Sequence, residues 1–236
     1  GDYLLSGVGV TDAPAALAIP KAPVVYISGK PADNDKGFVK TTLVSGSYEY
    51  NYDRQAMRTL GFTVTDDPAK ADIIVGNVAL DQGEKGAAAV AAVKAGTPYI
   101  ATGPLEYISK NLVTDLTYTT LGMEALHTVT YPTDSLITAS YAADGDHVLY
   151  TYSCGVLTSV PAGATVLIQA AEQDSFIAGC CLNENGTPID GFVEAIALER
   201  DGMDLTIFAN SVNNRAHQQD DYRYVTNAIY AKMSTG

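Results

Sequence analysis

Short apolar runs alternate with helix-like patterns in the first half of the chain. Each run is bounded by Gly, Pro or Asp, which is typical of strands buried on both faces of a parallel sheet. The predicted strands cover residues 23–28, 62–65, 72–76 and 99–102. Between them, Tyr52, Ala56 and Leu60 predict one helix face, and residues 84–95 form an alanine-rich helix pattern that stops at Gly96. This alternation predicts a parallel sheet covered by helices.

After about residue 112, the pattern changes to an alternation of period two, rich in Thr and Tyr, which is typical of strands. The predicted strands cover residues 117–120, 125–131, 147–153, 164–170, 176–181, 192–198 and 203–208. Asn185-Gly186 and Asp201-Gly202 predict tight hairpin turns. Tyr222, Val225 and Ile229 mark one face of a closing helix. We therefore expect an α/β fold with a mainly parallel central sheet and a β-rich second half that rejoins it.

The domain organisation follows from the same pattern. Residues 1–22 are rich in Gly, Ala and Pro with little periodicity, and we interpret them as an irregular lead-in or linker. Residues 23–236 are expected to form a single α/β domain. Because the sequence opens Gly1-Asp2-Tyr3 without Met, we expect a processed or excised piece of a larger protein.

Composition and charge exclude several classes of function. With 47% hydrophobic and 17% charged residues, the chain is too apolar to be disordered. A formal net charge of −13 argues against nucleic acid or an anionic membrane surface as a partner, since both attract basic patches. No apolar run reaches the roughly 20 residues of a membrane-spanning helix, so no membrane insertion is expected.

The scarcity of His and Cys, three of each, leaves little material for a metal site or a thiol active site. His127, His147 and His217 lie far apart, and none has Glu three or four residues on, so no metal is expected. Residues 29–37 lack both phosphate-loop motifs and a complete calcium loop, and no cofactor is expected. Two readings of the cysteines stay open: three small buried side chains, or a bond between Cys154 and one of Cys180 and Cys181.

A sharp strand-to-helix turn is expected at residues 99–104, in the geometry of a nucleophile elbow. The elbow needs Cys or Ser, whereas this sequence offers Ala101 and Thr102, followed by Gly103. Ala101 cannot attack a substrate, and no neighbouring base is evident for Thr102. The turn is therefore either purely structural or a degenerate elbow.

A second candidate is the polar segment 210–217, which follows a predicted strand and precedes the last helix. Ligands of open α/β sheets bind at such carboxyl ends of strands. Arg215 offers a planar fork for a carboxylate or phosphate, beside Asn213 and His217. These three residues are the predicted ligand-binding candidates; alternatively, Arg215 ties the loop to an acidic side chain.

The elbow-like turn at residues 99–104 and the closing segments 207–210, 214–217 and 222–230 resemble the class I glutamine amidotransferase-like domain. The particular version is the one found C-terminal to the catalytic domain of some bacterial secreted zinc carboxypeptidases. The resemblance implies a flavodoxin-like three-layer sandwich, with a nucleophilic Cys at the elbow and a His/Glu pair late in the chain. Ala101 stands where the Cys would be, and no His-x-Glu follows near the end, so the usual thiolate route is not expected.

The resemblance therefore implies a non-catalytic accessory domain of a larger bacterial protein, extracellular or in the cell envelope. Its expected work is interdomain support or ligand binding. The expected partners are the catalytic domain of the same polypeptide and a peptide or cell-envelope glycan. The alternative is a hydrolase that acts through Thr102 or through a site without a recognised motif.

Overall fold

The computed structural model describes residues 23–27, 52–76, 83–102, 105–121, 123–152, 155–181, 189–210, 212 and 220–233. Their helices are α2 (Tyr52–Thr59), α3 (Gly83–Lys94), α4 (Glu106–Asn111), α5 (Ala139–Asp144) and α6 (Tyr222–Met233), with a short 3-10 turn at Pro68–Lys70. The strands of the first half are β1 (Val24–Ile27), β2 (Thr63–Thr65), β3 (Ile73–Val75) and β4 (Tyr99–Thr102). Those that follow are β5 (Thr117–Thr120), β6 (Met123–Thr130), β7 (Val148–Tyr152), β8 (Gly155–Ser159), β9 (Thr165–Ala170), β10 (Phe176–Cys181), β11 (Val193–Arg200) and β12 (Met203–Phe208).

The parallel part of the sheet has the order β2-β1-β3-β4-β12, in which every neighbouring pair is parallel. This order is that of flavodoxin-like folds, in which ligands bind outside the carboxyl ends of the strands. β1, β3 and β4 are short, apolar and almost entirely buried, as expected for strands covered on both faces. The predicted parallel sheet is confirmed.

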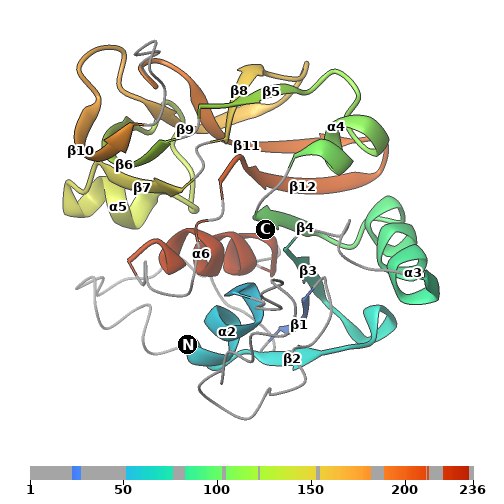
Figure 1. The fold of residues 1–236 in the computed structure, drawn as a ribbon. Helices are drawn as coiled ribbons and strands as arrows, with labels where there is room; N and C mark the ends of the chain where they lie inside the picture. Colours follow the sequence, from blue (N-terminus) through green and yellow to red (C-terminus); the bar gives the residue numbers. More distant parts are fainter. Residues whose placement is uncertain are drawn as a thin grey trace, which may run out of the picture.

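Helices cover both faces of this sheet and give the fold three layers (Figure 1). On one face, Ala56 and Met57 of α2 and Val225 and Ile229 of α6 pack in one cluster with apolar side chains of β1 and β3. On the other face, Ala89 of α3 and Ile108 of α4 pack on β4 and β12, among other side chains. Tyr222, Val225 and Ile229 are buried, which confirms the predicted face of the last helix.

The β-rich half joins the same sheet through β11, which pairs antiparallel with β12. The sheet continues through β9 and β6 to β10, while β7 pairs with β6, and β8 pairs with β5 and β11. The second half therefore extends the parallel sheet, as expected. No helix among the described residues is long and apolar enough to cross a membrane.

The hairpin between β11 and β12 turns at Asp201 and Gly202, whose φ angles are 53° and 77°. Both are left-handed, as a two-residue hairpin turn requires, so this predicted turn is confirmed. The expectation for Leu60 was wrong: α2 ends at Thr59, and Leu60 is an exposed hydrophobic side chain. The segment 1–22, the loop after β1, the Asn185-Gly186 turn and the cysteine side chains lie outside the described residues.

Candidate functional site at the carboxyl edge of the sheet

The predicted elbow lies at the end of β4, between β3 and β12. Ala101 pairs with Ile207 and Thr102 with Phe208, so both backbones are held in the parallel ladder. The Ala101 side chain is 1% exposed and belongs to the cluster under α3 and α4. Thr102 is 3% exposed. Neither residue therefore presents a side chain to solvent, and Gly103 lies outside the described residues.

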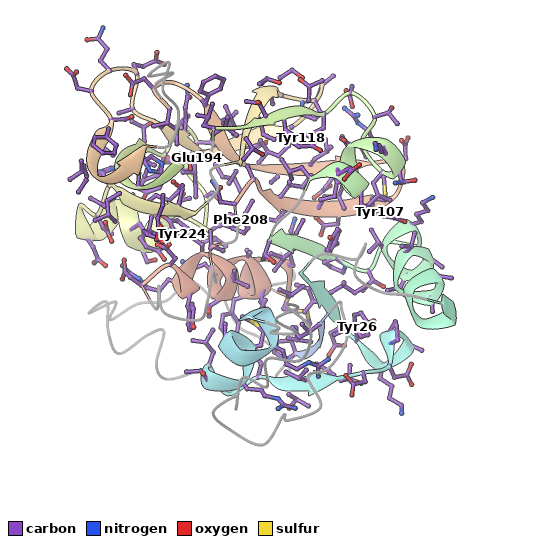
Figure 2. All side chains as sticks on the ribbon, in the orientation of Figure 1. Tyr26, Tyr107, Tyr118, Glu194, Phe208 and Tyr224 are labelled. Atoms are coloured by element: carbon purple, nitrogen blue, oxygen red, sulfur yellow. The ribbon has the colours of Figure 1, made fainter. Side chains whose placement is uncertain are left out.

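A buried polar network that we did not predict from the sequence lies beside the ends of β11 and β12. His127 Nε2 of β6 is 2.5 Å from Glu194 Oε1 of β11, and both side chains are almost completely buried. Asn210, just after β12, donates from Nδ2 to Glu194 Oε2 at 3.3 Å. Since a carboxylate only accepts, the imidazole donates through Nε2, and His127 Nδ1 has no hydrogen-bond partner among the described residues. Figure 2 labels Glu194 near Phe208 and Tyr224.

A β-bulge sets the position of Glu194. Val193 of β11 pairs with Gln169 of β9, but Ala195 pairs with Ile168, so Glu194 is an extra residue on its strand. Bulges turn side chains away from the regular alternation and are common beside functional sites. The Glu194 carbonyl still accepts a hydrogen bond from Ala209 N at 2.8 Å, which continues the pairing with β12. A Glu within the apolar run of residues 193–198 was the sequence signal for this site.

Asn210 joins this network to the start of β8. Its Oδ1 accepts a hydrogen bond from Gly155 N at 2.7 Å, while its Nδ2 reaches Glu194. Gly155 is required by close approach, because a Cβ there would lie 2.5 Å from the carbonyl oxygen of Ala209. One side chain therefore ties together β8, β11 and the end of β12.

Asp221, at the start of α6, adds a second buried acid. Burial, followed by the negative charges of Asp220, Asp146 and Glu194, raises the pKa of Asp221 to about 8. Its Oδ2 has no hydrogen-bond partner among the described residues. At neutral pH, Asp221 is therefore mainly a protonated, uncharged acid.

Aromatic and charged contacts fix the first turn of α6. The rings of Tyr141 and Tyr224 stack with centroids 3.8 Å apart, and the Arg223 guanidinium lies 4.2 Å from the centroid of the Tyr141 ring. Arg223 also pairs with Asp144 at 2.7 Å, and Tyr141 donates to the Asp220 carbonyl at 2.6 Å. Burial raises the pKa of the Tyr131 phenol, which bonds Tyr224, to about 12.

The chemistry open to this arrangement is limited. The buried His127–Glu194 pair and Asp221 can hold or exchange protons, but Ala101 supplies no nucleophile at the adjacent elbow. No group of three or more His, Cys, Asp or Glu in the described parts of the chain could hold a metal ion. Of the predicted ligand-binding residues, Asn213, Arg215 and His217 lie outside the described residues. Asn210 and Asp220, which bracket them in sequence, are described and are held by hydrogen bonds.

No protein-family model matches the sequence, and no curated protein is significantly similar to it. Solved structures do match. A GMP synthase-type protein from Thermoplasma acidophilum is 9% identical with a TM-score of 0.51, and the match covers 90% of this chain and 94% of that one. A cytoplasmic protein from Salmonella typhimurium is 11% identical with a TM-score of 0.52, over 90% of this chain and 99% of that one. At such identities, the likeness establishes the fold alone, which is of the class I glutamine amidotransferase-like type.

Proposed function

We propose that this chain is a non-catalytic amidotransferase-like accessory domain of a larger bacterial protein, acting in interdomain support or ligand binding. The observation that carries the proposal is the state of the elbow. Ala101, at the position where the resemblance puts the nucleophile, faces the core, and the Thr102 side chain is buried. An amidotransferase needs an accessible thiolate at this turn.

Turnover assays test the absence of catalysis. The chain would be incubated with glutamine, esters and peptides, and no turnover above the buffer rate is expected. Turnover that Thr102→Ala abolishes would establish the alternative, a hydrolase, and overturn the proposal. Ser109→Ala, on the partly exposed side of α4, is the matched control for loss of a hydroxyl.

A thiol placed at the elbow tests its accessibility independently of any substrate. In folded Ala101→Cys, we expect the new thiol to react with an alkylating reagent at least about 100-fold more slowly than in urea. Ala143→Cys, on the exposed side of α5, is the control and should react at nearly the same rate in both states. Peptide mapping separates these thiols from Cys154, Cys180 and Cys181. Fast alkylation of folded Ala101→Cys would show an open elbow.

We further propose that the parent is a secreted zinc carboxypeptidase and that its catalytic domain contacts Asn213, Arg215 and His217. The support is the likeness of the closing segment, and the location would then be extracellular or cell-envelope. A peptide or cell-envelope glycan is the other proposed ligand of this loop. In the parent gene, a His-x-x-Glu zinc motif is expected upstream of the codon for Gly1, and its absence would remove this proposal.

Binding measurements with the separately produced catalytic domain of that parent test the loop. Arg215→Ala is expected to weaken binding about tenfold or more, as for loss of a paired cation at an interface. Lys94→Ala, at the exposed end of α3, is the matched control and should leave binding unchanged. Equal binding by both variants would argue against this loop as the contact.

A further inference from the structure

The negative charge of the molecule is concentrated in its β-rich half. Residues 111–199 contain eleven Asp and Glu and no Lys or Arg, so they supply −11 of the formal net charge of −13. The rest of the chain is nearly balanced. This segment includes every strand from β5 to β10 and nearly all of β11. A single-signed field of this kind steers and selects partners of opposite charge.

The same half exposes a group of large apolar side chains. On β6, Ala125, His127 and Val129 point into the protein, so Leu126 between them points outward and is 39% exposed. Ala178 of β10 pairs with Leu126 and is also exposed. Phe176 and Ile177, which begin β10, are each 48% exposed.

Val148 of β7, paired with Thr128 and 38% exposed, extends this surface across β6. We call Leu126, Val148, Phe176, Ile177 and Ala178 the β6–β10 face. Figure 1 shows β7, β6 and β10 together, at the opposite end of the molecule from α3. Four of the seven exposed large hydrophobic side chains among the described residues lie on this face. A gathering of this kind marks an interaction site more often than scattered single residues do.

Acidic side chains border the apolar group. Glu124 is on the outward side of β6, and Glu172 and Asp174 precede β10; all three are exposed. Glu124 accepts a hydrogen bond from Tyr150 of β7 at 2.5 Å, which holds its carboxylate over the sheet. With no Lys or Arg anywhere in residues 111–199, these carboxylates have no cation from their own part of the chain.

We propose that the β6–β10 face docks an extended polypeptide segment in which Lys or Arg alternates with apolar residues. The apolar side chains of the segment pack on Leu126, Phe176 and Ile177, and its cations pair with Glu124, Glu172 and Asp174. Alternation suits an extended segment because its side chains point to opposite sides in turn. A second copy of the same face is disfavoured, because both partners would be acidic. This surface is separate from the elbow and from Arg215, so the inference does not depend on the proposed accessory role.

Fluorescence anisotropy with a labelled synthetic peptide that alternates Lys with Val tests the proposal on the full chain. We expect saturable binding, with little binding of the matched peptide that alternates Glu with Val. Leu126→Thr/Ile177→Thr should weaken binding about tenfold, since two exposed apolar contacts are lost. Glu172→Gln/Asp174→Asn should weaken it similarly and reduce its salt dependence. Leu60→Thr removes an equally exposed apolar side chain from the other half and should change nothing.

Three results would overturn the inference. One is failure to bind the Lys-Val peptide, and another is binding that the Leu126→Thr/Ile177→Thr variant leaves unchanged, which would show charge attraction without an apolar site. The third is a dimer in sedimentation that the same variant dissociates, which would make a second copy the occupant. Far-UV circular dichroism confirms that each variant is folded, as expected for substitutions of exposed side chains.

Discussion

Asp221 is a buried carboxyl group whose neighbours Asp220, Asp146 and Glu194 are also acids, with Arg223 as the nearest opposing charge. Its pKa is raised to about 8 in the folded protein, against roughly 3.9 in an unfolded chain. Between these values, the folded state keeps a proton that the unfolded state has lost. The contribution of Asp221 to stability is therefore present in acid and disappears as the pH rises toward 8.

Asp221→Asn removes this titration while keeping the shape of the neutral acid. We expect the stability of the variant relative to the natural chain to increase by about 3–5 kcal/mol between pH 4 and pH 8.5. Urea denaturation at several pH values measures this difference. Asp201→Asn, at the exposed hairpin turn, is the control and should show no such trend. A difference between Asp221→Asn and the natural chain that does not vary with pH would contradict the assigned burial.

Glu194 holds the buried polar network together, because His127 and Asn210 both bond to its carboxylate. Glu194→Ala leaves both partners buried without a bond, and we expect a loss of about 3 kcal/mol or more in unfolding free energy. Glu194→Gln keeps the shape and one acceptor, so it should cost less than half as much. Thermal and urea unfolding of both variants provide the comparison. Equal losses would show that hydrogen bonding to Glu194 is not what stabilises this region.

At the scale of the elements, the strands of the parallel part were predicted to within two residues, because buried strands form continuous apolar runs. β8 and α5 were missed. β8 begins at Gly155 with only Val156 and Leu157 as a signal, and α5 has six residues and no side-chain cap. The His127–Glu194 pair was also missed, because its members are 67 residues apart and meet only through a bulge and the pairing of several strands.

The junction of β8 with β12 depends on the absence of a side chain at residue 155. In Gly155→Ala, the new Cβ would lie 2.5 Å from the Ala209 carbonyl oxygen, and the backbone must move to relieve the contact. The move also disturbs the bond from Gly155 N to Asn210. We expect a loss of about 2 kcal/mol or more in urea denaturation. Gly163→Asn, at a left-handed turn with open space around it, should cost less than about 1 kcal/mol; a similar cost for both would argue against the close approach.

The whole molecule is held together by a core that crosses from one half to the other. Val25 and Ile73 of the parallel half belong to the same buried cluster as Val129, Leu149 and Leu167 of the β-rich half. The backbone is continuous as well, since β12 pairs with β4 on one side and with β11 on the other. A chain built in this way is expected to unfold as one cooperative unit.

Tryptophan reporters test this expectation, because the natural sequence contains no Trp. Phe62→Trp reports on the packing of the parallel half, and Phe192→Trp reports on the separate small cluster around Val156 and Ile189. Each larger ring costs about 1–3 kcal/mol, so each variant is compared with itself by fluorescence and far-UV circular dichroism in urea. The two signals should coincide in both variants. If the fluorescence of Phe192→Trp changes at a lower urea concentration than its circular dichroism, the β-rich half unfolds separately, and residues 23–236 are two folding units.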